Sequence, residues 1–284
     1  MKITDLFKKK TVLSYEVFPP KPTAPVNTIY NTLNELKELS PDFISVTYGA
    51  GGAKNNNETF KIAQTIRNYG IESVAHLPCI GLSKADVSEK LQELKNIGVE
   101  NILALRGDIP KDGYTKGDFE HASDLIEFIK AHGDFDIIAA CYPEGHIESA
   151  NKVDDIQNLK RKLDAGVDHL ITQLFFDNEY FYSFLERCQI AGINVPIEAG
   201  IMPVTNKKQI ERMASLCGVT VPEKFILMME RYENNPVAMR DAGIAYAVDQ
   251  IVDLISQEVD GIHIYTMNNP YIARKIYEAI HNII

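Results

Sequence analysis

Short runs of β-branched and apolar residues alternate with longer amphipathic stretches along the whole chain. This alternation predicts repeated βα units, because a buried parallel strand is a continuous apolar run and a surface helix repeats its apolar residues every three or four positions. The predicted strands cover 12–18, 43–48, 72–77, 101–106, 136–142, 169–175, 195–201 and 261–266. Eight strands, each followed by a helix, match the count that a closed (β/α)8 barrel requires.

Signals at the ends of the helical stretches support the same plan. Gly98 and Gly166 each follow an apolar-periodic segment, and Asn235-Pro236 supplies a cap followed by a first-turn proline. Residues 205–258 hold more helix than one βα unit needs, and we expect helices at about 205–217, 221–233 and 236–257. Because no Pro/Gly/Ser-rich linker separates them, we interpret them as an elaboration of one barrel domain spanning residues 1–284.

The alternative architecture is a doubly wound open sheet, which often binds nucleotides through a glycine-rich loop. Neither G-x-G-x-x-G nor G-x-x-x-x-G-K-[ST] occurs in the chain, and the glycine cluster at 49–52 has neither spacing. The sequence therefore favours the α/β class, as a (β/α)8 TIM barrel with extra helices before the last strand.

Composition and charge narrow the range of partners. The chain has 284 residues, 45% of them apolar, so it can bury a full core. Lys and Arg total 29 against 39 Asp and Glu, and the net charge of −10 argues against nucleic acid or an anionic membrane as a partner. A negatively charged ligand must therefore be held by a local cluster of positive side chains.

The sequence gives no indication of export or of disulfide bonds. Its first ten residues lack the apolar core of a signal peptide, and no segment approaches the roughly 18 uninterrupted apolar residues of a membrane span. We therefore expect a cytoplasmic protein. The cysteines at 79, 141, 188 and 217 are far apart and form no C-x-x-C pair, so we expect reduced thiols rather than disulfides or a zinc ribbon.

Candidate chemistry lies where the predicted strands end, because the carboxyl ends of barrel strands converge on the mouth that holds the active sites of this fold. Seven of the eight predicted strands end in polar residues: Glu16, Thr47, His76, Arg106 with Asp108, Tyr142, Gln173 and Tyr265. We expect these side chains to face one mouth.

Glu16 is the first candidate for a proton donor. It lies inside an otherwise apolar strand that Pro19-Pro20 terminates. A carboxyl group in apolar surroundings has a raised pKa, which a general acid at neutral pH needs. The alternative is a buried glutamate that pairs with an arginine for structural reasons.

Arg106-Gly107-Asp108 follows the fourth predicted strand. The arginine could hold a phosphate, the glycine permits close backbone approach, and the aspartate could bind a ring N–H. The alternative is a turn that carries a surface ion pair.

A second group follows the fifth predicted strand. Tyr142 and His146 end that strand, and the next helix carries Asp155, Asn158 and Lys162 at spacings that put them on one face, with Arg161 alongside. Such a face can bind a ribose hydroxyl through the acid and phosphates through the bases. The alternative is a solvated stripe of charge.

Metal and hydrolase chemistry have little support in the sequence. His76 and His146, with Cys79 or Cys141, have no repeated ligand spacing, and H-E-x-x-H is absent, so we expect no metal site. Thr47 and its neighbour Ser45 lack a G-x-S-x-G context. The residues alone indicate a barrel enzyme with an acid and a phosphate-binding helix, but they do not name the reaction.

Nine segments together are similar to one family. They are 15–20 (YEVFPP), 45–50 (SVTYGA), 75–77 (AHL), 103–108 (LALRGD), 140–144 (ACYPE), 158–162 (NLKRK), 171–177 (ITQLFFD), 200–204 (GIMPV) and 264–268 (IYTMN). In this order, and covering nearly the whole chain, they closely resemble the methylenetetrahydrofolate reductases.

This resemblance implies a (β/α)8 barrel that holds FAD without a Rossmann fingerprint. It places flavin contacts on Tyr48, Ala50, His76, Arg106, Gly107, Asp108, Ala122, Tyr142, His146, Asp155, Asn158, Arg161 and Lys162. Thr47 and Gln173 resemble contacts of NADH (or NADPH), and Gln173, Gln209, Tyr265 and Asn269 occupy folate positions.

The resemblance also implies a reaction order and two catalytic residues, Glu16 and Asp108. NADH reduces the flavin and leaves, and 5,10-methylenetetrahydrofolate then takes the same face. Glu16 would protonate the departing nitrogen as the five-membered ring opens. Asp108 would bind the pterin and disfavour an anionic reduced flavin. The product would be 5-methyltetrahydrofolate, which serves one-carbon metabolism and methionine synthesis.

Two positions depart from the family pattern. Met213 stands where many relatives place a phenylalanine that packs over ligands, and Asn269 stands where many have an arginine that binds folate. A thioether can still pack on a planar ligand, but loss of the arginine removes a charge-assisted partner for the substrate carboxylate. We expect both changes to affect donor preference and affinity more than the reaction.

Three alternatives stay open at this point. An iron–sulfur or other redox partner subunit could deliver the electrons, the chain could be a non-catalytic folate- or flavin-binding subunit, or it could be a pterin-dependent methyltransferase barrel. Relatives form homo-oligomers, so we expect one here, and we expect no additional regulatory domain after Ile284.

Overall fold

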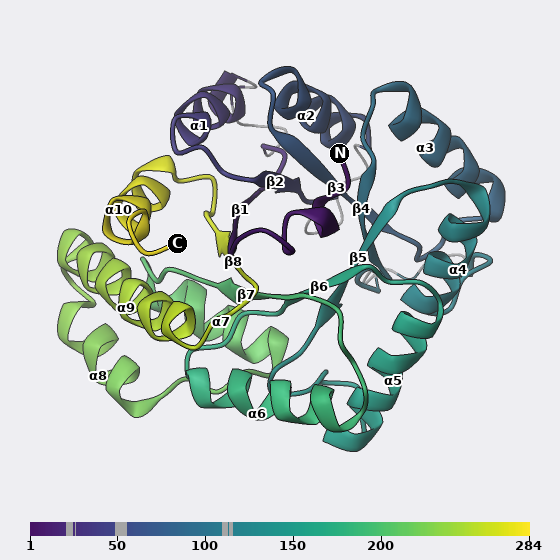
Figure 1. The fold of residues 1–284 in the computed structure, drawn as a ribbon. Coiled ribbons are helices and arrows are strands. Elements are labelled where there is room, and N and C mark those ends of the chain that lie inside the picture. The colour runs from purple at the N-terminus through teal and green to yellow at the C-terminus, as the bar shows by residue number, and fades with distance from the viewer. Residues whose placement is uncertain (21–24, 26, 49–55, 110–112, 114–115) are drawn as a thin grey trace.

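The computed structural model describes residues 1–20, 25, 27–48, 56–109, 113 and 116–284. Within this part of the chain, parallel strands close into one barrel in sequential order (Figure 1). The strands are β1 (Val12–Val17), β2 (Phe43–Val46), β3 (Glu72–Pro78), β4 (Asn101–Leu105), β5 (Asp136–Cys141), β6 (His169–Thr172), β7 (Ile197–Ile201) and β8 (Gly261–Tyr265). The (β/α)8 prediction is confirmed and the open-sheet alternative is wrong.

The helices form a ring around these strands (Figure 1). They are α1 (Asn27–Lys37), α2 (Asn56–Asn68), α3 (Lys84–Asn96), α4 (Ala122–His132), α5 (Lys152–Asp164), α6 (Asn178–Ile190), α7 (Lys207–Cys217), α8 (Glu223–Tyr232), α9 (Pro236–Ser256) and α10 (Pro270–Ile280). The short 3₁₀ helix η1 (Ile3–Asp5) lies inside this ring. No helix among the described residues is long and apolar enough to cross a membrane.

The three helices predicted within 205–258 are present as α7, α8 and α9. Asn206 and Asn235 cap α7 and α9 through their side-chain oxygens, as the Asn235-Pro236 signal predicted. Gly98 and Gly166 have positive φ angles of 73° and 114° after α3 and α5, which confirms them as helix ends.

The sixth strand is shorter than predicted. The apolar run extends to Phe175, but β6 ends at Thr172. Leu174 and Phe176 instead pack with residues of α7 and α8 in a separate apolar cluster, which also contains Ile210 and Phe225. The run is apolar because the loop is buried under the extra helices, not because the strand continues.

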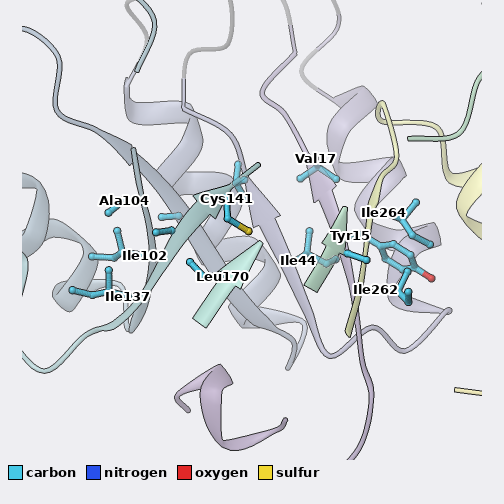
Figure 2. Close-up of a cluster of buried hydrophobic side chains, with 14 of the residues drawn as sticks. Tyr15, Val17, Ile44, Ile102, Ala104, Ile137, Cys141, Leu170, Ile262 and Ile264 are labelled. Atoms are coloured by element: carbon cyan, nitrogen blue, oxygen red, sulfur yellow. The ribbon is translucent and has the colours of Figure 1, made fainter. Parts of the chain in front are cut away.

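The main core lies between the strands and the ring of helices. Figure 2 shows outward-facing strand side chains of this core, including Tyr15, Val17, Ile102 and Ile264, all of them fully or almost fully buried. Burying such side chains contributes roughly 1.5–3 kcal/mol each. This layer fixes each strand and therefore the position of the residue that follows it.

A second core fills the barrel interior at the end opposite the mouth. Phe43, Val74 and Ile138 pack there against Ile3 of η1, with Leu6 and Phe7 alongside. The backbone N–H of Ile3 donates to Asn101 Oδ1 at 3.1 Å, and Thr4 donates to Asp136 through its N–H and its hydroxyl. These contacts close this end of the barrel.

Candidate active site

Glu16 reaches the mouth from the second-last position of β1, between Ser45 on β2 and Tyr265 on β8. Its side chain is 20% exposed, and Oε2 lies 3.5 Å from His76 Nε2 and 3.9 Å from His263 Nε2. The inner face of the strand is polar at Ser14 and Glu16, so the carboxyl group lies near imidazoles rather than in the apolar pocket we expected. The nitrogen atoms that lie near its carboxyl group among the described residues belong to histidines, not to an arginine.

His76 faces Glu16 as a neutral ring. Burial lowers the pKa of His76 to about 4, so the imidazole is uncharged at neutral pH. Its Nε2 has no hydrogen-bond partner among the described residues. A buried ring nitrogen beside a carboxyl group is therefore available to a ligand.

A hydrogen-bonded line continues from His263 into the barrel. Ser14 Oγ lies 2.6 Å from His263 Nδ1 and donates to Glu198 Oε1 at 2.9 Å. Glu198 is fully buried, and burial raises the pKa of its carboxyl group well above the ordinary value. Glu198 Oε2 lies 3.9 Å from His169 Nε2, so a neutral carboxyl group sits between two buried histidines.

Arg106 and Asp108 follow β4, as expected for groups at the mouth. The Arg106 guanidinium donates to both carboxylate oxygens of Glu148 at 2.6 and 2.9 Å, and these bonds raise the pKa of the arginine. The ion pair matches the alternative interpretation of this segment. Gly107 has φ 89°, and a Cβ there would lie 2.9 Å from Pro78 Cβ, so packing inside the protein already requires glycine. Asp108 is exposed.

The β5 exit and α5 form a compact polar cluster. Tyr142 and His146 meet edge to face at 4.6 Å, and Asp155 Oδ1 accepts from the His146 N–H at 2.9 Å and from Ser149 Oγ at 3.2 Å. Lys162 Nζ donates to the carbonyl of Ala140 at 2.9 Å and lies over the Tyr142 ring.

This cluster bears on the alternative interpretation of the α5 face as a solvated stripe. Asp155 is 7% exposed, and burial lowers the pKa of Lys162, so a solvated stripe is wrong for these two residues. Asn158 and Arg161 differ, because Arg161 is exposed and donates to Asn158 Oδ1 at the edge of the cluster. Helical spacing therefore places buried Asp155 and half-buried Lys162 inside the cluster, while Asn158 and Arg161 keep contact with solvent at its edge.

The remaining predicted contacts are placed as follows. Gln173 Oε1 accepts from the N–H of Leu174, and Tyr265 Oη donates to the carbonyl of Thr172 at 2.6 Å. Gln209 lies in the first turn of α7 and Ala122 begins α4. Ala50 lies outside the described residues.

Asn269 and Met213 occupy the two positions that depart from the family pattern. Asn269 caps α10, with its Oδ1 accepting from the N–H of Ile272 at 3.4 Å. Met213 packs at the edge of the α7–α8 apolar cluster. The capping role could have been predicted, because Asn269-Pro270 repeats the signal of Asn235-Pro236.

Several residues at the site were missed in the sequence. Ser14 and His263 stand two positions before Glu16 and Tyr265, so strand alternation alone places them on the same inward face. Glu198 and Glu148 carried no comparable signal. Asn268, whose side chain contacts the backbone beyond Glu16, lay inside a recognised segment but was given no role.

Among the residues that the structure describes, no group of three or more His, Cys, Asp or Glu could hold a metal ion. Cys79 and Cys141 are buried free thiols whose pKa values burial raises.

A family profile and sequence relatives point to one family. The profile of the family described as Methylenetetrahydrofolate reductase matches residues 2–281. The chain belongs to this family. A 5,10-methylenetetrahydrofolate reductase of Pectobacterium carotovorum subsp. carotovorum is 38% identical over 269 residues, which cover 94% of this chain and 89% of that one.

A plant relative and a solved structure extend the comparison. The Arabidopsis thaliana protein named Methylenetetrahydrofolate reductase (NADH) 1 is 34% identical over 289 residues, which cover 94% of this chain and 49% of that one. A solved Clostridium thermocellum structure, described as binding two copies of 5-methyl-5,6,7,8-tetrahydrofolic acid, matches with a TM-score of 0.68 at 13% identity, covering 98% of this chain and 96% of that one. At that identity the second match supports the fold alone. Family membership supports methylenetetrahydrofolate reductase activity, that is, an oxidoreductase acting on a folate.

Proposed function

We propose that the protein reduces 5,10-methylenetetrahydrofolate to 5-methyltetrahydrofolate, with FAD as its cofactor and NADH or NADPH as the donor. The observation that carries this proposal is the setting of Glu16, a partly exposed carboxyl group 3.5 Å from a buried, neutral His76 at the barrel mouth. A protonated carboxyl group there can donate to a ligand nitrogen that enters from solvent. The name of the Arabidopsis relative supports NADH as the donor.

The residues at the mouth fit a flavin. Thr47 Oγ1 and His76 Nε2 are buried and have no hydrogen-bond partner within the described residues, so they can bind the polar edge of a ring system, with Tyr48 next to Thr47 in the chain. When bound, the flavin would carry the hydride between nicotinamide and folate. These three side chains, together with Gly107 and Asp108 on the β4 loop, would surround its ring.

The α5 cluster fits the rest of the dinucleotide. Lys162 uses one of its three ammonium donors on Ala140, which leaves two for phosphate oxygens. Both described bonds to the Asp155 carboxylate fall on Oδ1, so Oδ2 can accept from a ribose hydroxyl. Arg106, Arg161 and Asn158 would supply further donors, with Tyr142, His146 and Ala122 enclosing the cofactor.

Glu16 and a few neighbours would act on the folate. Glu16 would give its proton to the departing nitrogen, which leaves the one-carbon unit ready to accept hydride. Asp108 would bind the pterin ring, and Gln173 and Gln209 would hold the substrate at the β6 exit and the start of α7. Tyr265, fixed through its hydroxyl to Thr172, would present its ring edge, and Asn269 would offer a weaker hold on the substrate carboxylate than an arginine.

An anaerobic spectrum of the purified protein tests this proposal. We expect flavin absorbance that bleaches with NADH and returns on addition of 5,10-methylenetetrahydrofolate. Retention of colour with NADH, combined with activity on an artificial reductant, would replace NADH by a redox partner protein as the donor. A colourless protein that takes up no flavin would refute the cofactor assignment, and oxidation of flavin without 5-methyltetrahydrofolate as product would refute the reaction.

We also propose a homo-oligomer that uses the extra helices. Leu216 of α7, Leu227 of α8 and Val237 of α9 are 65%, 59% and 58% exposed, and apolar side chains on neighbouring helices favour contact with another copy. Light scattering at working concentration measures the mass, and a monomer would refute this proposal.

A further inference from the structure

The chain leaves β8 through two successive left-handed residues that are not glycine. Met267 has φ 52° and Asn268 has φ 55°. Asparagine tolerates this conformation better than most residues, whereas an unbranched apolar side chain such as methionine rarely adopts it. A conformation of this kind persists only where surrounding contacts hold it.

The contacts that hold it belong to the β1 exit. Asn268 Oδ1 accepts from the backbone N–H of Phe18 at 3.0 Å, and Asn268 Nδ2 donates to the carbonyl of Phe18 at 2.8 Å. Thr266 Oγ1 donates to the carbonyl of Glu16 at 2.7 Å and accepts from the Asn268 N–H at 3.2 Å. The side chains of Thr266 and Asn268 therefore fix the backbone on both sides of Val17.

This arrangement continues strand pairing where the backbone cannot. The β1–β8 register ends at Glu16 opposite Tyr265. The next residues after Phe18 are Pro19 and Pro20, which have no N–H for a ladder. The amide of Asn268 offers one acceptor and one donor, as a paired peptide group does, and so ties down Phe18 beyond the last ladder pair.

Fixing the β1 exit also fixes the position of Glu16. Its carboxyl group lies 3.5 and 3.9 Å from two imidazole nitrogens, at the second-last residue of a strand whose exit β2 holds on one side and Thr266 with Asn268 on the other. We propose that Asn268 is a positioning residue for Glu16, whose amide, together with Thr266, fixes the β1 exit so that the carboxyl group points at the substrate nitrogen. This inference rests on the proposed function, because it assigns Glu16 the proton transfer.

Two glycine substitutions separate positioning from backbone strain. Asn268→Gly keeps the left-handed conformation at no steric cost and removes both bonds to Phe18. Met267→Gly relaxes the neighbouring left-handed residue in the same way but leaves those bonds intact. Because misplacing a reacting group by about 1 Å can cost on the order of 100-fold, we expect Asn268→Gly to slow oxidation of the reduced protein by folate about 10- to 100-fold.

The two half-reactions provide the internal control. Reduction by NADH does not use Glu16, so stopped-flow absorbance should give that rate within about twofold of the unsubstituted protein in both variants. Met267→Gly should leave both half-reactions within about twofold. Equal rates of oxidation of the reduced protein by the folate in Asn268→Gly and Met267→Gly would overturn the inference, and so would a parallel loss of both half-reactions in Asn268→Gly.

A spectroscopic readout keeps the test independent of the reaction. The ¹³C signal of the Glu16 carboxyl carbon can be assigned by its absence in Glu16→Gln. We expect Asn268→Gly to shift or broaden this signal and Met267→Gly to leave it in place. An unchanged signal in Asn268→Gly would overturn the positioning role even if the protein catalysed another reaction, whereas a shifted signal in a protein that does not reduce the folate would count against the proposed function alone.

Discussion

The Arg106 guanidinium and the Glu148 carboxylate form a two-point ion pair, with N–O distances of 2.6 and 2.9 Å. Arg106 is also the β4 residue proposed to bind the cofactor. An anionic ligand that uses this guanidinium has to compete with Glu148, whose pKa the arginine lowers, so that the carboxylate is charged at neutral pH.

Removing this competitor should tighten flavin binding. Since partly exposed ion pairs are worth roughly 0.2–1 kcal/mol, we expect Glu148→Gln to lower the Kd for FAD by about two- to fivefold. This Kd is measured from the quenching of flavin fluorescence as FAD is titrated with the flavin-free protein. Glu278→Gln, which removes the same charge on distant α10, is the control, and equal or weaker binding by Glu148→Gln would contradict the prediction.

The role of Glu16 predicts a split between the two half-reactions. Glu16→Gln keeps the shape of the side chain but cannot donate a carboxyl proton, and general acid catalysis contributes typically 10²–10⁴-fold. We expect NADH to bleach the flavin of the variant at a near-normal rate, while folate restores the colour at least about 100-fold more slowly. Normal turnover by this variant would rule out the proposed proton donor.

Buried Glu198 should make the protein less stable as pH rises. Its pKa is raised in the folded protein, so above about pH 4.5 the unfolded chain releases this proton while the folded chain retains it. The unfolding free energy therefore falls by up to about 1.4 kcal/mol per pH unit until the carboxyl group of the folded protein also ionises.

Glu198→Gln removes that penalty. We expect the unfolding free energy of the variant, relative to the unsubstituted protein, to increase between pH 5 and pH 8 in urea titrations. Glu35→Gln, at an exposed position on α1, should show no such trend. A difference that does not change with pH would show that Glu198 is charged in the folded protein.

The buried histidines should destabilise the protein in acid. Burial lowers the pKa of His76 to about 4 and that of His169 to about 3. Below about pH 6.5 the unfolded chain binds protons at these positions and the folded chain does not, so stability falls between pH 6.5 and pH 4.

One substitution isolates this effect. His169→Gln should reduce the slope of unfolding free energy against pH in that range by up to about 1.4 kcal/mol per pH unit, whatever it does to stability at pH 8. His281→Gln, at an exposed residue after α10, is the matched control. Identical slopes in the two variants would mean that His169 is accessible to protons in the folded protein.

The fold could be predicted because its signals are local. Apolar runs identify the strands, and the Asn235-Pro236 cap and Gly98 mark helix ends within a few residues of their positions. The inner members of the α5 cluster, Asp155 and Lys162, could also be predicted, because helical spacing places them on one face. Overextension of β6 to Phe175 shows the limit of such signals, since a buried loop and a buried strand are equally apolar.

The rest of the site depends on contacts between distant parts of the chain. Glu198 and Ser14 are 184 positions apart, and Ser14 and His263 are 249 positions apart, so no local pattern shows that they meet. The pair Arg106 and Glu148 joins two loops, and the left-handed turn at Met267 and Asn268 contains no glycine to mark it. Such features follow from closure of the barrel, which only the three-dimensional structure shows.

Closure of the barrel end by Ile3, Leu6 and Phe7 has a consequence for the order of events in catalysis. Among the described residues that end of the barrel is filled, so a folate would approach Glu16 from the mouth, and a nicotinamide donor would use the same entrance. Two ligands that use one entrance bind one after the other, and an excess of either ligand slows binding of the other. The turnover rate would then depend on the concentration ratio of donor to folate. Such a response to substrate levels would need no separate regulatory site.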